Sequence, residues 1–386
     1  MTSPILLHAG FDGLDLAYNT QISSELQAAL HHAKACAAEE RRAQAVTFGE
    51  HTFLVESHGA GGGYAFSVNT GEFGALWWFK ERRDGRDPWG VRVSSRALPL
   101  AVYGLDVVKV KLDQFLIGLG MSFSESDRRI SRIDYAIDYL IPGFAINPDN
   151  FVCHARRSKA VDGEFSADLR GTKFNGIRIG KMPNAQICIY DKRREVIDKR
   201  KAFWWDIWAN RAKAHSPILS NQSPIWRFEF RAGRNAIDKA IKRRTWEAFS
   251  RDPSLLFRKI AFQTRLALPQ SDINRARWPN APVWDQCQRE LERVSVSHDT
   301  NVDVAKIIAE LRSANLRTLE SQTVGLILTQ TAAYGLKVGD IPAVLEQVRL
   351  DIEAKFRGVA NTPDEMLEMR TASYQVRFGD ACKGSE

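Results

Sequence analysis

Three separate stretches of the chain alternate between apolar and polar residues, the pattern of a strand with one buried and one polar face. These stretches lie within Arg128–Phe144, Gln186–Tyr190 and Ser223–Gly233. The second follows another short segment, Ile177–Gly180, across a turn that contains Pro183 and Asn184, so the two are predicted to form a hairpin. If these strands are neighbours in one sheet, their polar side chains share one face.

The rest of the pattern predicts more strands, with helices between them. Strands are expected at Ile5–Tyr18, Val46–Ser57, Tyr64–Thr70, Ala75–Arg83 and Trp89–Ser95, and helices at Ser24–Arg42, Leu105–Leu119, Asp149–Arg157 and Glu195–Lys213. The predicted fold class is α+β, with an antiparallel sheet, helices on one face of it and a helical C-terminal portion. The phrase LDLAY at Leu14–Tyr18 is similar to RIDYAID at Arg132–Asp138, which leaves open a duplicated β-α-β unit.

A change in composition divides the chain into two parts. From about Gln270 the residues favour helix, and a Pro-containing segment near Trp278–Val283 marks the change. We therefore predict a first domain over residues 1–268. A helical region over residues 269–386 follows, and the sequence does not define its role.

Charge and cysteine content restrict the class of protein. The 386 residues carry a formal net charge of +8 with a pI near 9.2, which suits a polyanionic partner. The five cysteines have no CxxC spacing, which argues against a structural zinc site and a disulfide framework. The N-terminus lacks the features of a signal peptide, and no apolar run is long enough to span a bilayer. We expect a soluble cytoplasmic protein without a membrane partner.

Tyr190 is the candidate nucleophile. It leaves the apolar side of its predicted strand and ends among the charged residues Asp191–Arg194. A phenol there can attack a phosphate; the alternative is a tyrosine at the rim of the core with its hydroxyl in water. Cations on the shared polar face or beside Tyr190 can hold phosphate oxygens, so they are candidate DNA-binding residues. They are Arg132, Arg178, Lys192, Arg193, Arg227 and Arg231.

Two carboxylates on adjacent strands can hold a divalent cation such as Mg²⁺ or Mn²⁺. Asp134 and Asp138 lie about 13 Å apart at ~3.3 Å per residue, so only one of them can join Glu229. Asp134 is preferred because it and Glu229 each follow an Arg and an apolar residue, in RID and RFE. Asp138 and Asp15 are the alternatives. These acids and arginines can equally form cross-strand ion pairs on a solvated face.

Aromatic residues occupy both faces of another predicted strand, at Trp77, Trp78 and Phe79. Core packing on both sides is one interpretation, and a surface on which a base can stack is the other. The second would also suit an RNA-binding module, although nothing in the sequence requires RNA.

The motifs together resemble the replication initiation factors of rolling-circle plasmids of the pT181 type and related relaxases of integrative elements. The resemblance covers Leu6–Leu268 and rests on RIDYAID, on GIRIG followed by ICIYDKRRE, and on WRFEFRAG. In that family the tyrosine of the phrase matching IYDK becomes linked to a 5′ phosphate, and the freed 3′ hydroxyl primes synthesis. Acidic residues hold the metal there in place of a histidine pair, and this chain likewise has no His-x-His motif.

The resemblance implies a replication initiation protein of a mobile element that nicks one DNA strand at an origin. Tyr190 would be the catalytic residue of this tyrosine endonuclease, and Asp134 and Glu229 would hold Mg²⁺ or Mn²⁺. The partner would be origin DNA, single-stranded at the nick, and a helicase and a second copy of the chain are further candidates. The alternative is a non-catalytic DNA-binding relative that acts in origin binding or repression.

Overall fold

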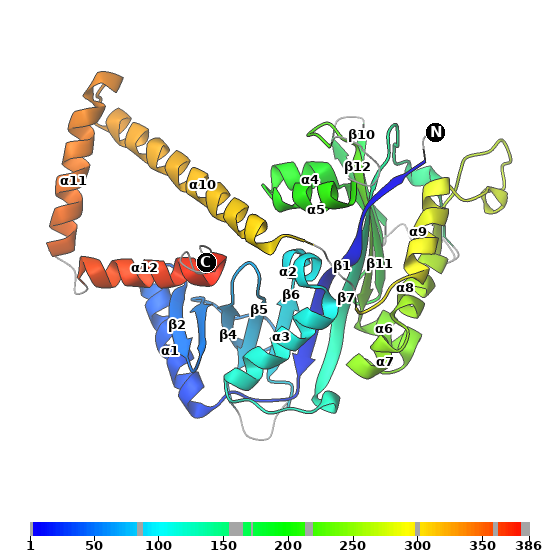
Figure 1. Ribbon diagram of the computed structural model, residues 1–386, viewed down its shortest axis with the longest axis horizontal. Coiled ribbons are helices and arrows are strands. Elements are labelled where there is room, and N and C mark those ends of the chain that lie inside the picture. The colour runs from blue at the N-terminus through cyan, green and yellow to red at the C-terminus, as the bar shows by residue number, and fades with distance from the viewer. Residues whose placement is uncertain are drawn as a thin grey trace.

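One antiparallel sheet runs through the part of the chain that the computed structural model describes, residues 3–82, 88–153, 165–170, 173–212, 219–297, 302–357 and 362–379. Its strand order is β2-β3-β4-β5-β6-β1-β7-β12-β11-β10-β9. The two longest strands, β1 (Ile5–Tyr18) and β7 (Arg128–Leu140), therefore lie side by side at its centre. Figure 1 shows this central pair and the helices around it. The α+β class with an antiparallel sheet is confirmed.

The two halves of the sheet repeat one topology. Each begins with a long central strand, continues as an antiparallel meander whose last strand pairs with that long strand, and ends in helices. The first half comprises β1, α1 (Ser24–Glu39), β2 (Gln44–Phe48), β3 (His51–Val55), β4 (Tyr64–Asn69), β5 (Leu76–Lys80), β6 (Val91–Ser95), α2 (Ala97–Tyr103) and α3 (Leu105–Gly118). The second comprises β7, β9 (Phe165–Arg170), β10 (Lys173–Gly180), β11 (Ala185–Asp191), α4 (Lys192–Asp198), α5 (Phe203–Ala212), β12 (Ile225–Gly233), α6 (Arg234–Ile241), α7 (Trp246–Ser250) and α8 (Pro253–Phe262). The predicted duplication therefore has a counterpart in the order of the strands.

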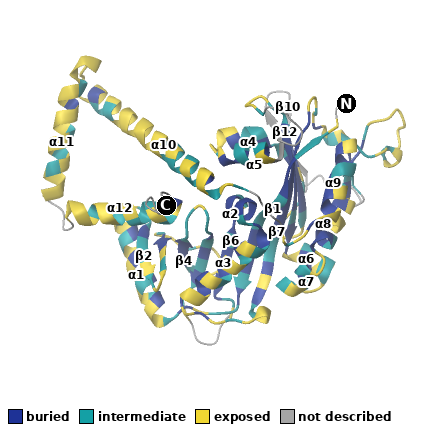
Figure 2. Cartoon of the chain, viewed as in Figure 1, coloured by how far each residue is buried: buried dark blue, intermediate teal, exposed yellow. Residues whose placement is uncertain are grey.

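The main core lies on one face of this sheet. Alternate residues of the central strands, such as Leu14, Ile133 and Phe228, are buried there against α1, α3, α6, α8 and α9 (Pro282–Glu292). Burial of this apolar area is the main favourable term in folding. Figure 2 shows the buried strands between partly exposed helices. The other face therefore carries the polar side chains of the same strands.

Two helices cover part of that polar face, so the helices are not confined to one side. Figure 1 shows α4 and α5 on the opposite side of β12 and β11 from α8 and α9. The buried Trp204 and Trp208 of α5 pack there with Leu7, Leu140 and Ile225 of the sheet. Only the remainder of the polar face is left open.

Two predicted helices differ from the observed structure. The predicted helix at residues 149–157 was wrong where it can be described, because Phe151–Cys153 is a strand, β8, that pairs with β13 (Thr264–Leu266). Residues 154–157 lie outside the described part. The predicted helix at 195–213 is two helices, α4 and α5. The break follows α4, where Arg200 has a left-handed φ of 52°, a conformation that ends a helix.

The last three helices extend away from the sheet, and we call them the arch: α10 (Val304–Ala333), α11 (Ile341–Arg357) and α12 (Pro363–Phe378). Figure 1 shows them as three sides of a triangle, and Figure 2 shows that they are largely exposed. α10 begins on α5, where Ile307 is buried and Lys306 pairs with Asp206. The end of α12 returns to the sheet, where the Glu72 amide, between β4 and β5, donates to the Arg377 carbonyl at 3.1 Å. Arg312 Nη2 of α10 also donates to the Gly379 carbonyl at 2.7 Å.

The arch starts later than the predicted boundary. α9 lies beyond residue 268, yet its Trp284 and Leu291 are buried in the main core of the sheet. The helices that leave the sheet begin only at Val304. A helical C-terminal portion is therefore present, but α9 packs as part of the first unit. No helix among the described residues is long and apolar enough to cross a membrane.

Candidate active site

A groove of about 770 Å³ crosses the open part of the polar face. Its lining comes from β5, β6, β1, β7, β12, β11 and β10, and from α4 at one end. Neighbouring strands lie ~4.8 Å apart, so these seven strands span about 29 Å. Tyr190, Asp134 and Glu229 all line this groove, although they come from three strands that are distant in sequence.

Tyr190 points into the groove from β11. Its hydroxyl donates to Oε2 of Glu229 at 3.3 Å. Gly176 lies opposite on β10, and a Cβ there would be 2.9 Å from the Tyr190 Cβ, so the glycine leaves room for the ring. Burial, followed by the charge of Glu229, raises the pKa of Tyr190 well above its usual value. The phenol is therefore neutral at pH 7, with a carboxylate placed to accept its proton.

Each acid is held by an arginine of its own strand. Arg231 donates to both carboxylate oxygens of Glu229 at 2.7 and 3.0 Å, and Arg132 donates from Nε to those of Asp134 at 3.0 and 2.9 Å. Asp134 lies opposite Arg231 in the register of β7 and β12, so the two acids are diagonal neighbours. A Cβ on Gly13 would be 2.9 Å from Asp134 Oδ2, so a glycine is needed beside this carboxylate.

The acids of the groove can hold a divalent cation only through two carboxylates, those of Asp134 and Glu229. No group of three or more His, Cys, Asp or Glu side chains suited to a metal occurs among the described residues. Mg²⁺ commonly binds through one or two carboxylates with water and substrate phosphate oxygens completing its shell. Asp134 and Glu229 fit that arrangement, and their two arginines would then be available to the phosphate.

Three of the predicted DNA-binding arginines face the groove. Arg178 on β10 is exposed, and the side chains of Arg132 and Arg231 are 35% and 24% exposed. Arg193 lies at the start of α4, pairs with Asp191 at 2.9 Å and is not among the residues that line the groove. The polar face therefore presents three guanidinium groups around the two acids and the phenol.

Arg227 and Lys192 are buried, so the prediction that they contact DNA is not supported. Arg227 is fully buried beneath the Trp204 ring and pairs with Asp138 and Asp12. Lys192 lines the α4 end of the groove, but its side chain is only 2% exposed and pairs with Glu195. Sequence alternation placed both on the polar face, but it did not reveal that α5 covers that part of the face.

The two alternative metal ligands have other partners. Both carboxylate oxygens of Asp138 are occupied by Arg227, at 2.6 and 2.8 Å, and Trp208 Nε1 also donates to Oδ2 at 2.9 Å. Asp15 lies in the groove and pairs with Arg92 at 3.1 Å. Asp138 is thus part of a buried ion pair. Asp15 lies on β1, next to the strand of Asp134 and three strands from the strand of Tyr190.

Asp12 and Arg92 line the groove but were not predicted. Asp12 alternates with the core residue Phe11, and a β-bulge between Phe11 and Gly13 shifts the register, so Asp12 and Asp15 both face the polar side although they are three residues apart. No sequence pattern marks that bulge. Arg92 could have been found, because it alternates with the apolar Val91 and Val93 in its predicted strand.

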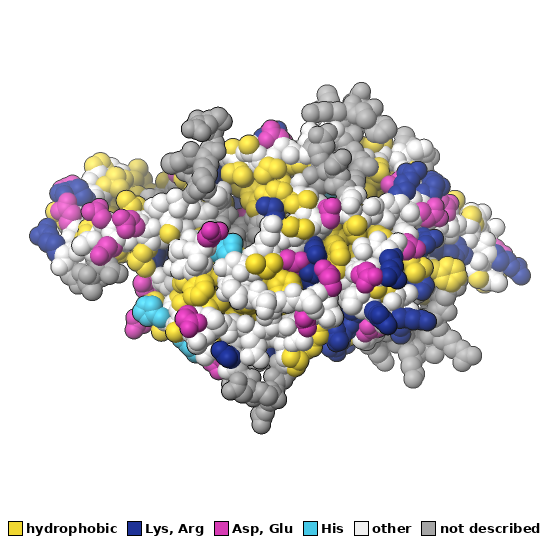
Figure 3. Space-filling model, turned by 60° about the horizontal axis from the view of Figure 1, so that its bottom comes forward, with side chains coloured by type: hydrophobic (Ala, Val, Ile, Leu, Met, Phe, Trp, Pro, Cys, Tyr) yellow, Lys and Arg dark blue, Asp and Glu magenta, His cyan; other side chains and the backbone are white. Residues whose placement is uncertain are grey.

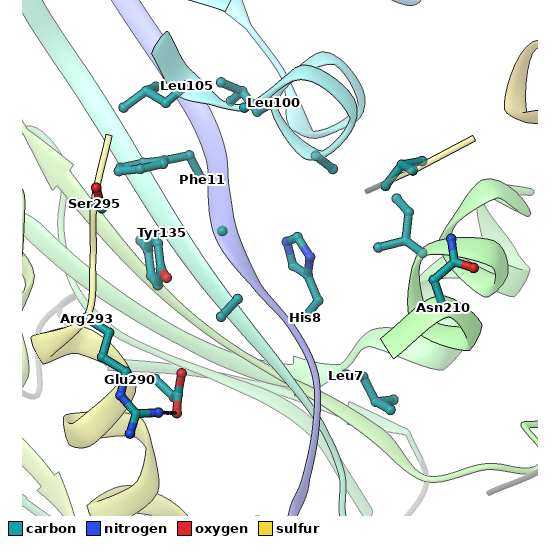
Figure 4. Close-up of a pocket in the computed structure, with 16 residues that line it drawn as sticks. Leu7, His8, Phe11, Leu100, Leu105, Tyr135, Asn210, Glu290, Arg293 and Ser295 are labelled. Carbon is teal, nitrogen blue, oxygen red and sulfur yellow. Dashed lines mark hydrogen bonds and ion pairs between the residues drawn. The ribbon is translucent and has the colours of Figure 1, made fainter. Parts of the chain in front are cut away.

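A second cavity of about 500 Å³ lies between β1, α2, α5 and α9 and shares no lining residue with the groove. Figure 4 shows it, with Arg293 joined to Glu290 and with His8, Phe11 and Tyr135 around it. Its described lining is largely apolar and contains no pair of carboxylates. The groove, not this cavity, therefore carries the candidate chemistry.

Ionisation of Asp134 is expected to reduce the stability of the metal-free protein as pH rises from about 4 to 8. Burial raises the pKa of Asp134 to about 7, with Arg132 opposing the rise and Glu229 adding to it. A carboxyl whose pKa is higher in the folded than in the unfolded state binds more protons when folded between those values, so unfolding becomes easier as it ionises. The change is at most about 4 kcal/mol. Urea denaturation across this range should show it.

Asp134→Asn is the control for that effect, because the amide does not ionise. The variant should lose the part of the pH dependence between pH 5 and 8 that Asp134 causes. Mg²⁺ added at pH 8 should stabilise the wild type more than the variant. Identical pH profiles for the two proteins would contradict the raised pKa.

One of the solved structures that are similar to this chain is of a replication protein. The sequence matches no known protein family and no curated protein. The fold is similar to the structure of a rolling circle replication initiator protein from Geobacillus stearothermophilus, with 13% sequence identity and a TM-score of 0.38. The match covers 75% of this chain and 98% of that chain.

Proposed function

We propose that the chain nicks a single DNA strand, with Tyr190 as the nucleophile, and so starts replication. The observation that carries the proposal is the Tyr190 hydroxyl 3.3 Å from a carboxylate oxygen of Glu229, in a groove that is also lined by Arg132, Arg178 and Arg231. A phenol with a proton acceptor beside it and cations around it is the arrangement that attack on a phosphodiester requires.

The reaction is a transfer of one phosphoryl linkage. The Tyr190 oxygen attacks the phosphorus, a new O–P bond forms and the bond from phosphorus to the 3′ oxygen breaks. Glu229 accepts the phenol proton, and the 3′ oxygen takes a proton from solvent. The products are a 5′ phosphotyrosine and a free 3′ hydroxyl that a polymerase can extend. Because the phosphotyrosine conserves the bond energy, rejoining needs no nucleotide cofactor.

The arginines of the groove have separate tasks in this proposal. Arg178 is exposed on β10, so its guanidinium is accessible to a phosphate. Arg132 and Arg231 are engaged with Asp134 and Glu229 and would turn to phosphate oxygens once a cation binds the acids. Mg²⁺ or Mn²⁺ held by these acids would supply charge stabilisation at the phosphate.

The distribution of charge supports DNA binding on the sheet and not on the arch. The arch carries nine basic and nine acidic residues between Val304 and Phe378, so the net charge of +8 belongs to the rest of the chain. Figure 3 shows Lys and Arg side chains interspersed with Asp and Glu on one face of the molecule. DNA should therefore bind through the groove, with affinity that falls as salt rises.

Capture of a covalent adduct tests the proposal. The protein is incubated with Mg²⁺ or Mn²⁺ and labelled single-stranded oligonucleotides from its own locus, and products are separated on a denaturing gel. We expect a labelled band at the mass of the protein plus the DNA fragment, and peptide mapping should place the phosphate on Tyr190. Reversible binding without any adduct would reject strand transfer.

The second candidate is a DNA-binding relative without catalysis. The observation that favours it is that both acids are neutralised by arginines and no third acid joins them among the described residues. This protein would bind the same DNA reversibly, so the adduct experiment separates the two. A helicase and a second copy of the chain remain predictions from the resemblance.

Asp134→Asn and Glu229→Gln are each expected to slow adduct formation by about 10²-fold or more, because each removes charge from the site that holds the cation and the phenol proton. Adduct yield is measured against Mg²⁺ concentration. Asp285→Asn is the matched control, since Asp285 lies on α9, accepts a hydrogen bond from Asn280 and does not line the groove. Full activity of both groove variants would place the metal site elsewhere.

A further inference from the structure

The first half of the sheet contains a counterpart of the Tyr190 site with different chemistry. Asp15 lies opposite Ser94 as Asp134 lies opposite Arg231, and the echo of LDLAY in RIDYAID aligns the same two acids. The next two strands correspond in the same way. Arg92 on β6 takes the place of Glu229 on β12, and Trp78 and Lys80 on β5 take the places of Cys188 and Tyr190 on β11. An acid, a thiol and the candidate nucleophile are thus replaced by a guanidinium, an indole and an amine.

Aromatic rings and cations are paired across this half of the polar face. The Arg92 guanidinium lies 5.3 Å from the Trp78 ring, the Lys80 amine lies 5.0 Å from the Tyr64 ring, and the Arg129 guanidinium lies 4.5 Å from the Trp89 ring. All three rings are half-buried. Trp77, the neighbour of Trp78, is buried in the main core, so the strand directs one indole to each face. Core packing therefore accounts for Trp77 and Phe79 but not for Trp78.

Trp78 and Arg92 line the same groove as Tyr190. They lie on β5 and β6, at the other end of the seven strands that the groove crosses, which are about 24 Å and about 19 Å from β11 at ~4.8 Å per strand. The Arg92 side chain is 45% exposed, so its charge is accessible to phosphate. A strand whose phosphate lies at Tyr190 can extend along the groove and reach the indole several nucleotides away.

We propose that Trp78 and Arg92 form a base-stacking subsite for the single DNA strand that runs along the groove, with Trp78 carrying a base and Arg92 a phosphate. The inference rests on the proposed function, because it assigns the nucleotides beside the cleaved bond. Stacking on an aromatic side chain tolerates every base, so this subsite holds the strand without reading its sequence. Tyr64–Lys80 and Trp89–Arg129 extend the same surface.

The test measures binding without cleavage. Tyr190→Phe serves as the parent protein, and its affinity for a fluorescent oligo-dT strand is measured by anisotropy. Adding Trp78→Ala should weaken binding between about fivefold and a hundredfold. Trp78→Phe should restore most of the affinity. The same Trp78→Ala change should have no effect on an abasic sugar-phosphate strand of equal length, because that strand has no base to stack.

Two further variants keep the test decisive. Trp246→Ala removes a Trp that also lies near a cation, Lys109, but packs on the opposite face of the sheet, and it should leave binding unchanged. Arg92→Ala, at an exposed side chain, should weaken binding and reduce its salt dependence even if Trp78→Ala does not fold. Unchanged affinity in Trp78→Ala, an equal loss on the abasic strand, or a loss confined to an RNA strand would overturn the subsite. Failure of the proposed function is a separate result, the absence of any adduct with the wild type.

Discussion

Tyr190→Phe is expected to abolish the covalent protein–DNA adduct, with a loss on the order of 10³-fold or more. The substitution removes only the hydroxyl, so the ring keeps its place between Gly176 and the rest of the groove. No other group then occupies the position 3.3 Å from Glu229 from which attack on phosphorus would start. The measurement is the yield of labelled adduct on a denaturing gel, together with nicking of supercoiled DNA.

Tyr103→Phe is the matched control for that experiment. Tyr103 is half-buried on α2, near Phe73 and Lys111, and does not line the groove, so its loss should leave adduct formation unchanged. Tyr190→Phe should still bind the single strand, since the cations of the groove are intact. An adduct that persists in Tyr190→Phe would show that another side chain is the nucleophile.

Asp138→Ala is expected to reduce the free energy of unfolding by about 3–5 kcal/mol. Asp138 and Arg227 are both fully buried and joined by two hydrogen bonds, and Trp208 of α5 donates to the same carboxylate. Removal of the carboxylate leaves the guanidinium in the interior with Asp12 as its remaining carboxylate partner. Urea denaturation followed by tryptophan fluorescence measures the loss.

Asp15→Ala tests the same kind of pair near the surface. Asp15 bonds to Arg92, whose side chain is 45% exposed, so the loss of stability should stay below about 1 kcal/mol. The contrast between the two variants distinguishes a structural acid from a groove acid. Normal stability in Asp138→Ala, together with a loss of Mg²⁺-dependent cleavage, would instead make Asp138 a metal ligand.

The polar face of the sheet could be predicted because strand alternation depends only on local sequence. Tyr190, Asp134 and Glu229 were expected on one face of neighbouring strands, and the register of β7, β12 and β11 brings them into one groove. The hairpin of β10 and β11 was also predicted, from a turn with Pro and Asn. Their roles in catalysis remain predictions.

The cover over part of that face could not be predicted. Trp204 and Trp208 indicate a helix that packs on the sheet, but their spacing does not say which face receives it. Because α5 lies on the polar face, Arg227 and Lys192 are buried there instead of facing solvent. Long-range packing, which leaves no periodic signal in the strands, decided the accessibility of these two cations.

The two attachments of the arch determine how it would respond to limited proteolysis. At one end, Lys306 and Ile307 of α10 contact α5. At the other end, the Arg377 carbonyl of α12 accepts from the Glu72 amide, and the Gly379 carbonyl accepts from Arg312 of α10. A single backbone cut at the exposed tip near Gly335, between α10 and α11, would leave both fragments fastened to the same body. Such a clipped chain would elute from a sizing column as one particle and separate only in denaturant.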